Sequence, residues 1–137
     1  MTAAYDPNFA NVYEKKNAAM LSCGAGICKF TGSRGKSGSN DASAEFLGEV
    51  RQMFEKEGVV WQTAELGKVD IGGGGTVAKY VANMNIDTVD IGVPVIHIHA
   101  PYEAIPQADL YRNYRAPAAS TTSCVGTPRE VPAALSH

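Results

Sequence analysis

Two nearly continuous apolar runs rich in β-branched residues constrain the fold most, Thr88 to Ile91 and Val93 to His99. Such runs are typical of strands buried on both faces of a sheet that helices cover. Segments 39–58, 76–85 and 107–116 carry apolar residues at helical spacing. This alternation predicts an α/β fold: a partial three-layer α/β/α sandwich, with a mostly parallel sheet flanked by helices.

The remaining elements follow from local signals. Shorter strands are predicted at Ile27 to Thr31 and at Val59 to Glu65. The first long helix should be capped by Ser39 or Asn40 and stopped by Gly58. The inward face of this helix is expected to include Leu47, Val50 and Phe54. A further helix is predicted from Gln107 to Ala116, with an apolar face that includes Ala108, Leu110, Tyr111 and Tyr114.

The composition of the chain argues against some classes of binding partner. A length of 137 residues suits one domain, and a net charge of −2 argues against a nucleic-acid partner. We expect no membrane partner, because no apolar run is long enough to cross a bilayer and the start lacks a signal-peptide core. Three cysteines without metal spacing suggest free thiols and a cytoplasmic location. Residues 117–137, rich in proline, serine and threonine, are predicted to be disordered.

His97 and His99 are the first candidates for chemistry. Two residues apart in a predicted strand, they should point to the same face. The pair could bind one metal, or one histidine could bind while the other packs. The alternative is a hydrogen-bonded pair beneath a loop. Glu103 could orient an imidazole through its second nitrogen, or could be a solvated loop charge.

The glycine run Gly72 to Gly75 precedes a predicted helix. Its N–H groups could bind a carboxylate or an oxyanion, or the run could be a tight turn between a strand and a helix. Lys29 ends a predicted strand and could face a pocket or solvent. Asp70 and Asp90 are possible ligands, although each could be a strand-end or capping carboxylate.

Gly35-Lys36-Ser37 resembles the end of a phosphate-binding loop. That motif also needs a glycine five positions before Gly35, and Phe30 stands there. A flexible surface loop is therefore favoured, and a phosphate-binding module at Gly32 to Ser39 is the weaker alternative.

Most parts of a hydrolytic metal site are missing from the sequence. Such a site needs at least three ligands and a base for the water. The chain has no adjacent Glu-Glu pair, no His-x-Asp and no second histidine cluster, and His137 lies in the predicted tail.

Two motifs resemble a known family. The segment Gly92-Val-Pro-Val-Ile-His-Ile-His99-Ala100 and the segment Ala4-Tyr5-Asp6-Pro7-Asn8-Phe9 are similar to the C-terminal part of the aspartyl aminopeptidase and vacuolar aminopeptidase I family of zinc metallopeptidases. The resemblance covers about residues 2–115. It identifies residues 1–116 as the C-terminal part of a catalytic domain and residues 117–137 as a tail outside the family.

The resemblance implies a peptide substrate, two zinc ions and a homo-oligomeric complete enzyme. His99 would be a metal ligand, whereas a small residue is usual where His97 stands. The implied substrate-binding residues are Lys29, Gly73, Gly74, Gly75 and Thr76. The family's general-base glutamate and its other ligands are expected upstream of this chain, the nearest of them immediately before Met1.

The sequence also departs from the family. Asp6 replaces the histidine usual in the acidic-specific branch, which puts a preference for N-terminal Asp or Glu in doubt, and the likeness ends after Ala116. We therefore expect a truncated zinc aminopeptidase that is inactive alone. The alternative is a non-catalytic α/β binding or assembly module.

Overall fold

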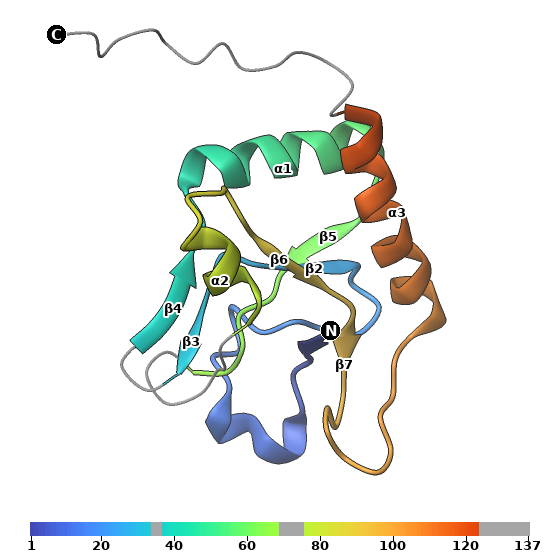
Figure 1. Ribbon diagram of the computed structural model, residues 1–137. Coiled ribbons are helices and arrows are strands. Elements are labelled where there is room, and N and C mark those ends of the chain that lie inside the picture. The colour runs from blue at the N-terminus through green and yellow to red at the C-terminus, as the bar shows by residue number, and fades with distance from the viewer. Residues whose placement is uncertain (34–36, 69–75, 124–137) are drawn as a thin grey trace, which may run out of the picture.

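The structure is a computed structural model, and it describes residues 1–33, 37–68 and 76–123 (Figure 1). Expectations for Lys36, Asp70, Gly72 to Gly75 and His137 lie outside the described residues. The elements in chain order are β1 (Thr2–Ala3), the 3-10 helix η1 (Pro7–Val12), β2 (Ala25–Cys28), β3 (Phe30–Ser33), β4 (Ser37–Asp41), α1 (Ala44–Lys56), β5 (Trp61–Thr63), α2 (Ala78–Ala82), β6 (Asp90–Gly92), β7 (Pro94–Val95) and α3 (Gln107–Ser123).

The predicted α/β class is confirmed, with mixed strand pairing. The central sheet has the order β5-β2-β6, in which β2 is parallel to β5 and antiparallel to β6. Strands β1 and β7 form a parallel pair, and β3 and β4 an antiparallel one. In Figure 1, α1 lies above the central sheet and the N-terminal segment with η1 lies below it.

Helix α1 buries the face that its periodicity predicts. Val50 and Phe54 are buried, and they join Ala25, Ile27, Val59 and Ala116 in the main hydrophobic cluster. Burying a side chain such as Phe54 contributes about 1.5–3 kcal/mol. Gly58 follows the helix with φ of +63°, as expected for a stop signal.

The predicted start of α1 is wrong. Ser43 is the N-cap, and its Oγ accepts the backbone N–H of Phe46 at 3.2 Å. Ser39 and Asn40 lie instead in β4, because residues 37–41 pair with β3. The predicted strand from Ile27 to Thr31 is likewise divided at Lys29 into the end of β2 and the start of β3.

Helix α3 turns its predicted apolar face outward. Leu110, Tyr111 and Tyr114 are exposed, whereas Asp109 is fully buried. The Asp109 carboxylate accepts the N–H groups of Ser22 at 2.6 Å and Gly24 at 3.0 Å. Hydrogen bonds to a distant loop therefore decide which side of α3 faces the protein.

The predicted end of α3 is also wrong. The helix continues past Ala116 to Ser123, with Pro117 inside it. A proline inside a helix removes one N–H donor, a cost that is not always enough to end the helix. The predicted domain boundary at residue 116 stays a prediction, because residues 124–137 lie outside the described residues.

Within the described part of the chain, no helix is both long and apolar enough to span a membrane.

Candidate metal and substrate site

His97 and His99 lie in a turn after β7, not in a strand. Their φ angles are +61° and +68°, a left-handed conformation that residues other than glycine adopt rarely. A backbone bridge between Ile96 and Ala104 closes the loop that holds them. The prediction that both side chains leave one face of a strand is therefore wrong.

His97 contacts the N-terminal segment. Its Nε2 lies 3.2 Å from Oδ2 of Asp6, whose side chain is 6% exposed. Asp6 also caps η1 by accepting the N–H of Asn8 at 2.9 Å. Because β1 and β7 are parallel, the residues that follow them meet at the same edge, and this brings Asp6 to His97.

His99 presents an exposed side chain on this turn. Glu103 Oε1 accepts its backbone N–H at 2.6 Å. Of the two alternatives for Glu103, an imidazole partner or a solvated loop charge, the structure shows an exposed carboxylate that binds the backbone of the turn. The bond fixes the turn from which the His99 imidazole projects.

A complete zinc site cannot be built from the described residues. Zinc in a catalytic site takes three protein ligands and leaves one position open. No group of three His, Cys, Asp or Glu side chains in residues 1–33, 37–68 and 76–123 could hold a metal ion. His99 can serve as one ligand by type and exposure, and the others would have to come from elsewhere.

The Thr76 side chain lies next to Asp90, the first residue of β6. Its Oγ1 donates to Oδ2 of Asp90 at 2.7 Å, so Asp90 acts here as a strand-end carboxylate. Gly73 to Gly75 lie outside the described residues. A pocket of about 530 Å³ beside Thr76 is lined by Met1, Thr76, Val77, Lys79, Tyr80 and Asp90.

Lys29 lies at the junction of β2 and β3 and forms an ion pair. Its Nζ contacts Oδ1 of Asp41, and its carbonyl accepts the N–H of Ala42 at 2.8 Å. Its own N–H donates to Oε1 of Glu65 at 3.1 Å. The Lys29 side chain, which could have faced a pocket or solvent, is 39% exposed and paired with Asp41, and it does not line the pocket beside Thr76.

Glu65 is a buried carboxyl group that the sequence analysis missed. Only 4% of the residue is exposed, and its Oε2 has no hydrogen-bond partner. Burial raises the pKa of Glu65 to about 7, although N–H groups of Lys29 and Phe30 oppose the shift. Its position at the end of a predicted strand is the signal that the sequence offers, and that position does not distinguish a buried carboxyl from a solvated one.

Cys28 is a buried thiol beside the same sheet end. Its Sγ contacts the carbonyl of Ala64 and lies 3.4 Å from Oγ1 of Thr2. Burial raises the pKa of the Cys28 thiol to about 11, which keeps it protonated and unreactive at neutral pH.

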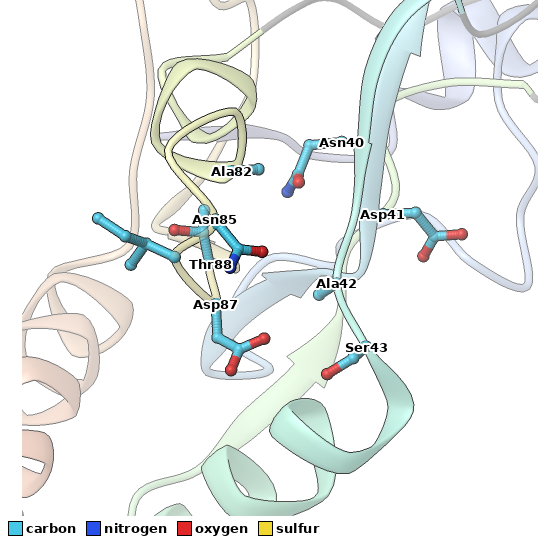
Figure 2. A pocket seen from close by; sticks show the side chains of 9 residues that line it. Asn40, Asp41, Ala42, Ser43, Ala82, Asn85, Asp87 and Thr88 are labelled. Carbon is cyan, nitrogen blue, oxygen red and sulfur yellow. The ribbon is translucent and has the colours of Figure 1, made fainter. Parts of the chain in front are cut away.

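A second pocket, of about 190 Å³, separates the end of β4 from the segment after α2 (Figure 2). The Asn40 side chain points into it, whereas Asp41 points away from it on the other side of the strand. Opposite faces are expected for neighbouring residues in a strand. Asp41 is therefore directed away from this pocket, and its partner is Lys29.

The strands on either side of the proposed phosphate-binding segment, Gly32 to Ser39, do not have the arrangement that such a loop needs. Such a loop leads from a strand directly into a helix. Here Ser33 pairs with Ser37, so the segment between them joins two antiparallel strands, and α1 starts only after β4.

The predicted site residues fall into two regions. Cys28 pairs with Asp90, so Lys29 and Thr76 lie near the start of β6. His97 and His99 follow β7, at the other end of the segment that contains β6 and β7. In Figure 1 the loop after β7 is well separated from the junction of β2 and β3.

Comparisons with known proteins identify relatives of most of the chain. The family described as aminopeptidase I zinc metalloprotease (M18) matches residues 1–119. A probable M18 family aminopeptidase 1 of Clostridium acetobutylicum is 52% identical over 111 residues, which are 81% of this chain and 24% of the relative. The corresponding protein of Thermotoga maritima is 45% identical over 112 residues, which are 82% of this chain and 25% of the relative.

Solved structures agree with these relatives. The crystal structure of aminopeptidase I from C. acetobutylicum has a TM-score of 0.82 at 50% identity, covering 86% of this chain and 26% of that one. The dodecamer PhTET1-12s shares the fold, with a TM-score of 0.62 at 20% identity over 88% of this chain and 31% of its own. This chain therefore spans about a quarter of the length of the M18 relatives.

Proposed function

This chain belongs to the aminopeptidase I zinc metalloprotease family (M18), and from that premise we propose that it forms part of an enzyme that removes N-terminal residues from peptides. The observation that carries the proposal is the match over residues 1–119. When bound, zinc would activate a water molecule and polarise the scissile carbonyl. We propose two ions per active site.

We propose that His99 is one zinc ligand. Its support is an exposed side chain on a turn that Glu103 holds through the backbone. His97 is engaged by Asp6 and would position the turn without binding metal. The remaining ligands and the general-base glutamate would come from the part of the fold that this chain does not span.

We propose that the substrate contacts Lys29, Gly73, Gly74, Gly75 and Thr76. The pocket beside Thr76 supports this proposal, since it lies at the end of the sheet where β2 and β6 meet. N–H groups there could hold the peptide while the histidine turn holds the metal.

The complete enzyme is proposed to be a cytoplasmic homo-oligomer. PhTET1-12s, which shares the fold, is a dodecamer. The free thiols of Cys23 and Cys28 suit a reducing compartment.

A chimeric enzyme tests the function and the ligand. Residues 1–119 of this chain would replace the matching segment of the C. acetobutylicum relative, and the release of leucine from leucyl peptides would be measured with zinc. In this chimera His99→Ala should lower kcat/KM by at least about 1,000-fold, whereas His97→Ala should cost less than about tenfold. Zinc content measured by mass spectrometry should fall only in the His99 variant.

Equal losses in the two variants would contradict the ligand assignment. The 137-residue chain alone should have no peptidase activity, because one ligand cannot retain a catalytic zinc.

The exposed face of α3, formed by Leu110, Tyr111 and Tyr114, favours a second candidate function, a non-catalytic assembly module. A folded chimera that assembles like its parent but cleaves no peptide would favour this alternative.

A further inference from the structure

The pocket between β4 and the segment after α2 is built from two distant parts of the chain. Its volume of about 190 Å³ is the space of about six water molecules, at roughly 30 Å³ each. Asn40 and Ser43 line one side of it, and Asn85 and Asp87 line the other (Figure 2). It shares no lining residue with the pocket beside Thr76, so it is separate from the proposed substrate site.

The Asn40 side chain is the strongest sign that this pocket takes a ligand. Asn40 is 7% exposed, and its side chain points into the pocket (Figure 2). Its Nδ2 has no hydrogen-bond partner in the described part of the chain. Buried donors nearly always have an acceptor, because an unpaired donor has lost its bonds to water. A ligand oxygen in the pocket would be that acceptor.

The same side of the pocket carries partial positive charge. Ser43 is the N-cap of α1, a helix of 13 residues, and the N-terminus of a helix attracts anions. The Ser43 Oγ accepts the N–H of Phe46, and its hydroxyl hydrogen can still be donated to a ligand. Glu45, the acidic residue of the first turn, does not line the pocket. This side therefore favours a carboxylate over an uncharged acceptor.

The opposite side suits a positively charged donor. Asp87 places a carboxylate there, next to the Asn85 side chain (Figure 2). A carboxylate has about four acceptor sites, so Asp87 can accept from a ligand in addition to any partner within the protein. An ammonium group would bring three donors and the opposite charge, which makes strong hydrogen bonds to a carboxylate.

The two sides together disfavour simpler ligands. An anion alone would meet the like charge of Asp87, and a cation alone would face the N-terminus of α1 and leave Asn40 Nδ2 unpaired. We propose that the pocket binds a small zwitterionic α-amino acid, whose carboxylate accepts from Asn40 and Ser43 and whose ammonium donates to Asp87. Aminopeptidases release such molecules; this link rests on the proposed function, whereas the binding itself does not.

An NMR titration of the 15N-labelled 137-residue chain with L-alanine tests the proposal. The side-chain amide of Asn40 reports binding directly, because its Nδ2 would donate to the ligand. Three further probes separate the chemical sources of binding. Propionate lacks the ammonium, ethylamine lacks the carboxylate, and glycerol is uncharged.

L-Alanine should shift the Asn40 amide resonances with saturation and a Kd of about 1–10 mM, because so small a ligand makes few contacts. Asp87→Asn and Asn40→Ala should each raise the Kd at least about fivefold, because each removes one end of the recognition. Asp41→Asn is the matched control: it removes the same charge from a residue that points away from the pocket, and it should change the Kd by less than about twofold (Figure 2).

Several results would overturn the proposal. One is the absence of a saturable shift up to about 100 mM L-alanine. Another is a Kd for propionate, ethylamine or glycerol as low as that for L-alanine, which would mean an anion, cation or polyol site. A third is an equal rise in Kd in Asp87→Asn and Asp41→Asn. Because the titration involves neither zinc nor peptide cleavage, its outcome is independent of the proposed function.

The zinc-loaded chimera described above takes the place of the 137-residue chain if that chain gives a poorly dispersed spectrum. The rise in Tm caused by about 50 mM L-alanine should be at least about twofold smaller in Asp87→Asn than in Asp41→Asn, because only the first variant loses a ligand contact. An equal rise in the two variants would overturn the proposal.

Discussion

Asp109 and Glu65 are both buried carboxyl groups, yet their surroundings differ. Asp109 accepts N–H groups from Ser22, Gly24 and the Arg112 guanidinium. Glu65 accepts the N–H of Lys29 on one oxygen, and its other oxygen has no partner. Burial raises the pKa of Glu65 because few donors compensate for the loss of water, whereas the three donors around Asp109 hold α3 in place.

The difference also separates two roles. Asp109 joins α3 to a loop 87 residues away in the sequence, which is a structural task. Glu65 lies beside Lys29, at the end of the sheet with the proposed substrate residues, and can change its charge near neutral pH. Four measurements test this contrast.

The largest effect is expected for Asp109→Ala. It leaves the N–H groups of Ser22 and Gly24 and the Arg112 guanidinium without the buried carboxylate that accepts from them, so the free energy of unfolding should fall by about 3–5 kcal/mol. Urea unfolding followed by Trp61 fluorescence would measure it. Gln107→Ala, at an exposed position in the same helix, is the control and should stay within about 0.5 kcal/mol. A loss below about 1 kcal/mol for Asp109→Ala would remove the contrast with Glu65.

The next effect is a pH dependence due to Glu65. Its pKa is about 7 in the folded protein, against 4.5 ordinarily, so the folded state holds the proton after the unfolded state has lost it. Its contribution is complete below pH 4.5 and is lost as pH rises to about 7, a decrease of up to about 3 kcal/mol. The difference in unfolding free energy between the wild type and Glu65→Gln should show this decrease between pH 4.5 and pH 8. A difference independent of pH would mean that Glu65 is as well satisfied as Asp109.

A smaller loss is expected for Arg112→Ala. The guanidinium donates to the Ser22 carbonyl at 2.8 Å and to Asp109 at 3.2 Å, so removing it should cost about 1–2 kcal/mol. Arg115→Ala is the matched control, because its bond to the Glu57 carbonyl is exposed and should contribute less than about 0.5 kcal/mol. If Arg112→Ala and Arg115→Ala lowered the free energy of unfolding equally, the hydrogen bonds around Asp109 would contribute no more to stability than an exposed one.

The smallest effect is expected on the outer face of α3. Tyr114 is 74% exposed, so Tyr114→Ser should change the free energy of unfolding of the 137-residue chain by less than about 0.5 kcal/mol. Thermal unfolding would be sufficient to measure this. A loss above about 1 kcal/mol would mean that the apolar face, and not Asp109, holds the helix.

Much of the fold was predictable because it depends on local pattern. The spacing of Val50 and Phe54 identified the buried face of α1, and Gly58 identified its end. The two β-branched runs overlap with β6, an edge strand of the three-stranded sheet, and contain β7. These signals are short-range, since they depend on helix and strand periodicity and on backbone preferences.

The candidate site was less predictable. The sequence indicated His99, Lys29 and Thr76 as candidates, but not their neighbours. Left-handed backbone at His97 and His99 replaced the expected strand, and Glu103 bound a backbone N–H in place of an imidazole. Glu65 was missed, because its burial depends on how β2, β5 and the hairpin pack together.

The α/β class, the buried face of α1 and the motifs that indicated the zinc aminopeptidase family can all be read from the sequence. Tertiary structure decided the orientation of α3, the conformation of the histidine turn and the partner of Lys29. The physical reason is the range of the interactions. Periodicity reports how one segment divides its own apolar and polar residues, whereas the donors that hold Asp109 and Glu65 come from segments far away in the chain.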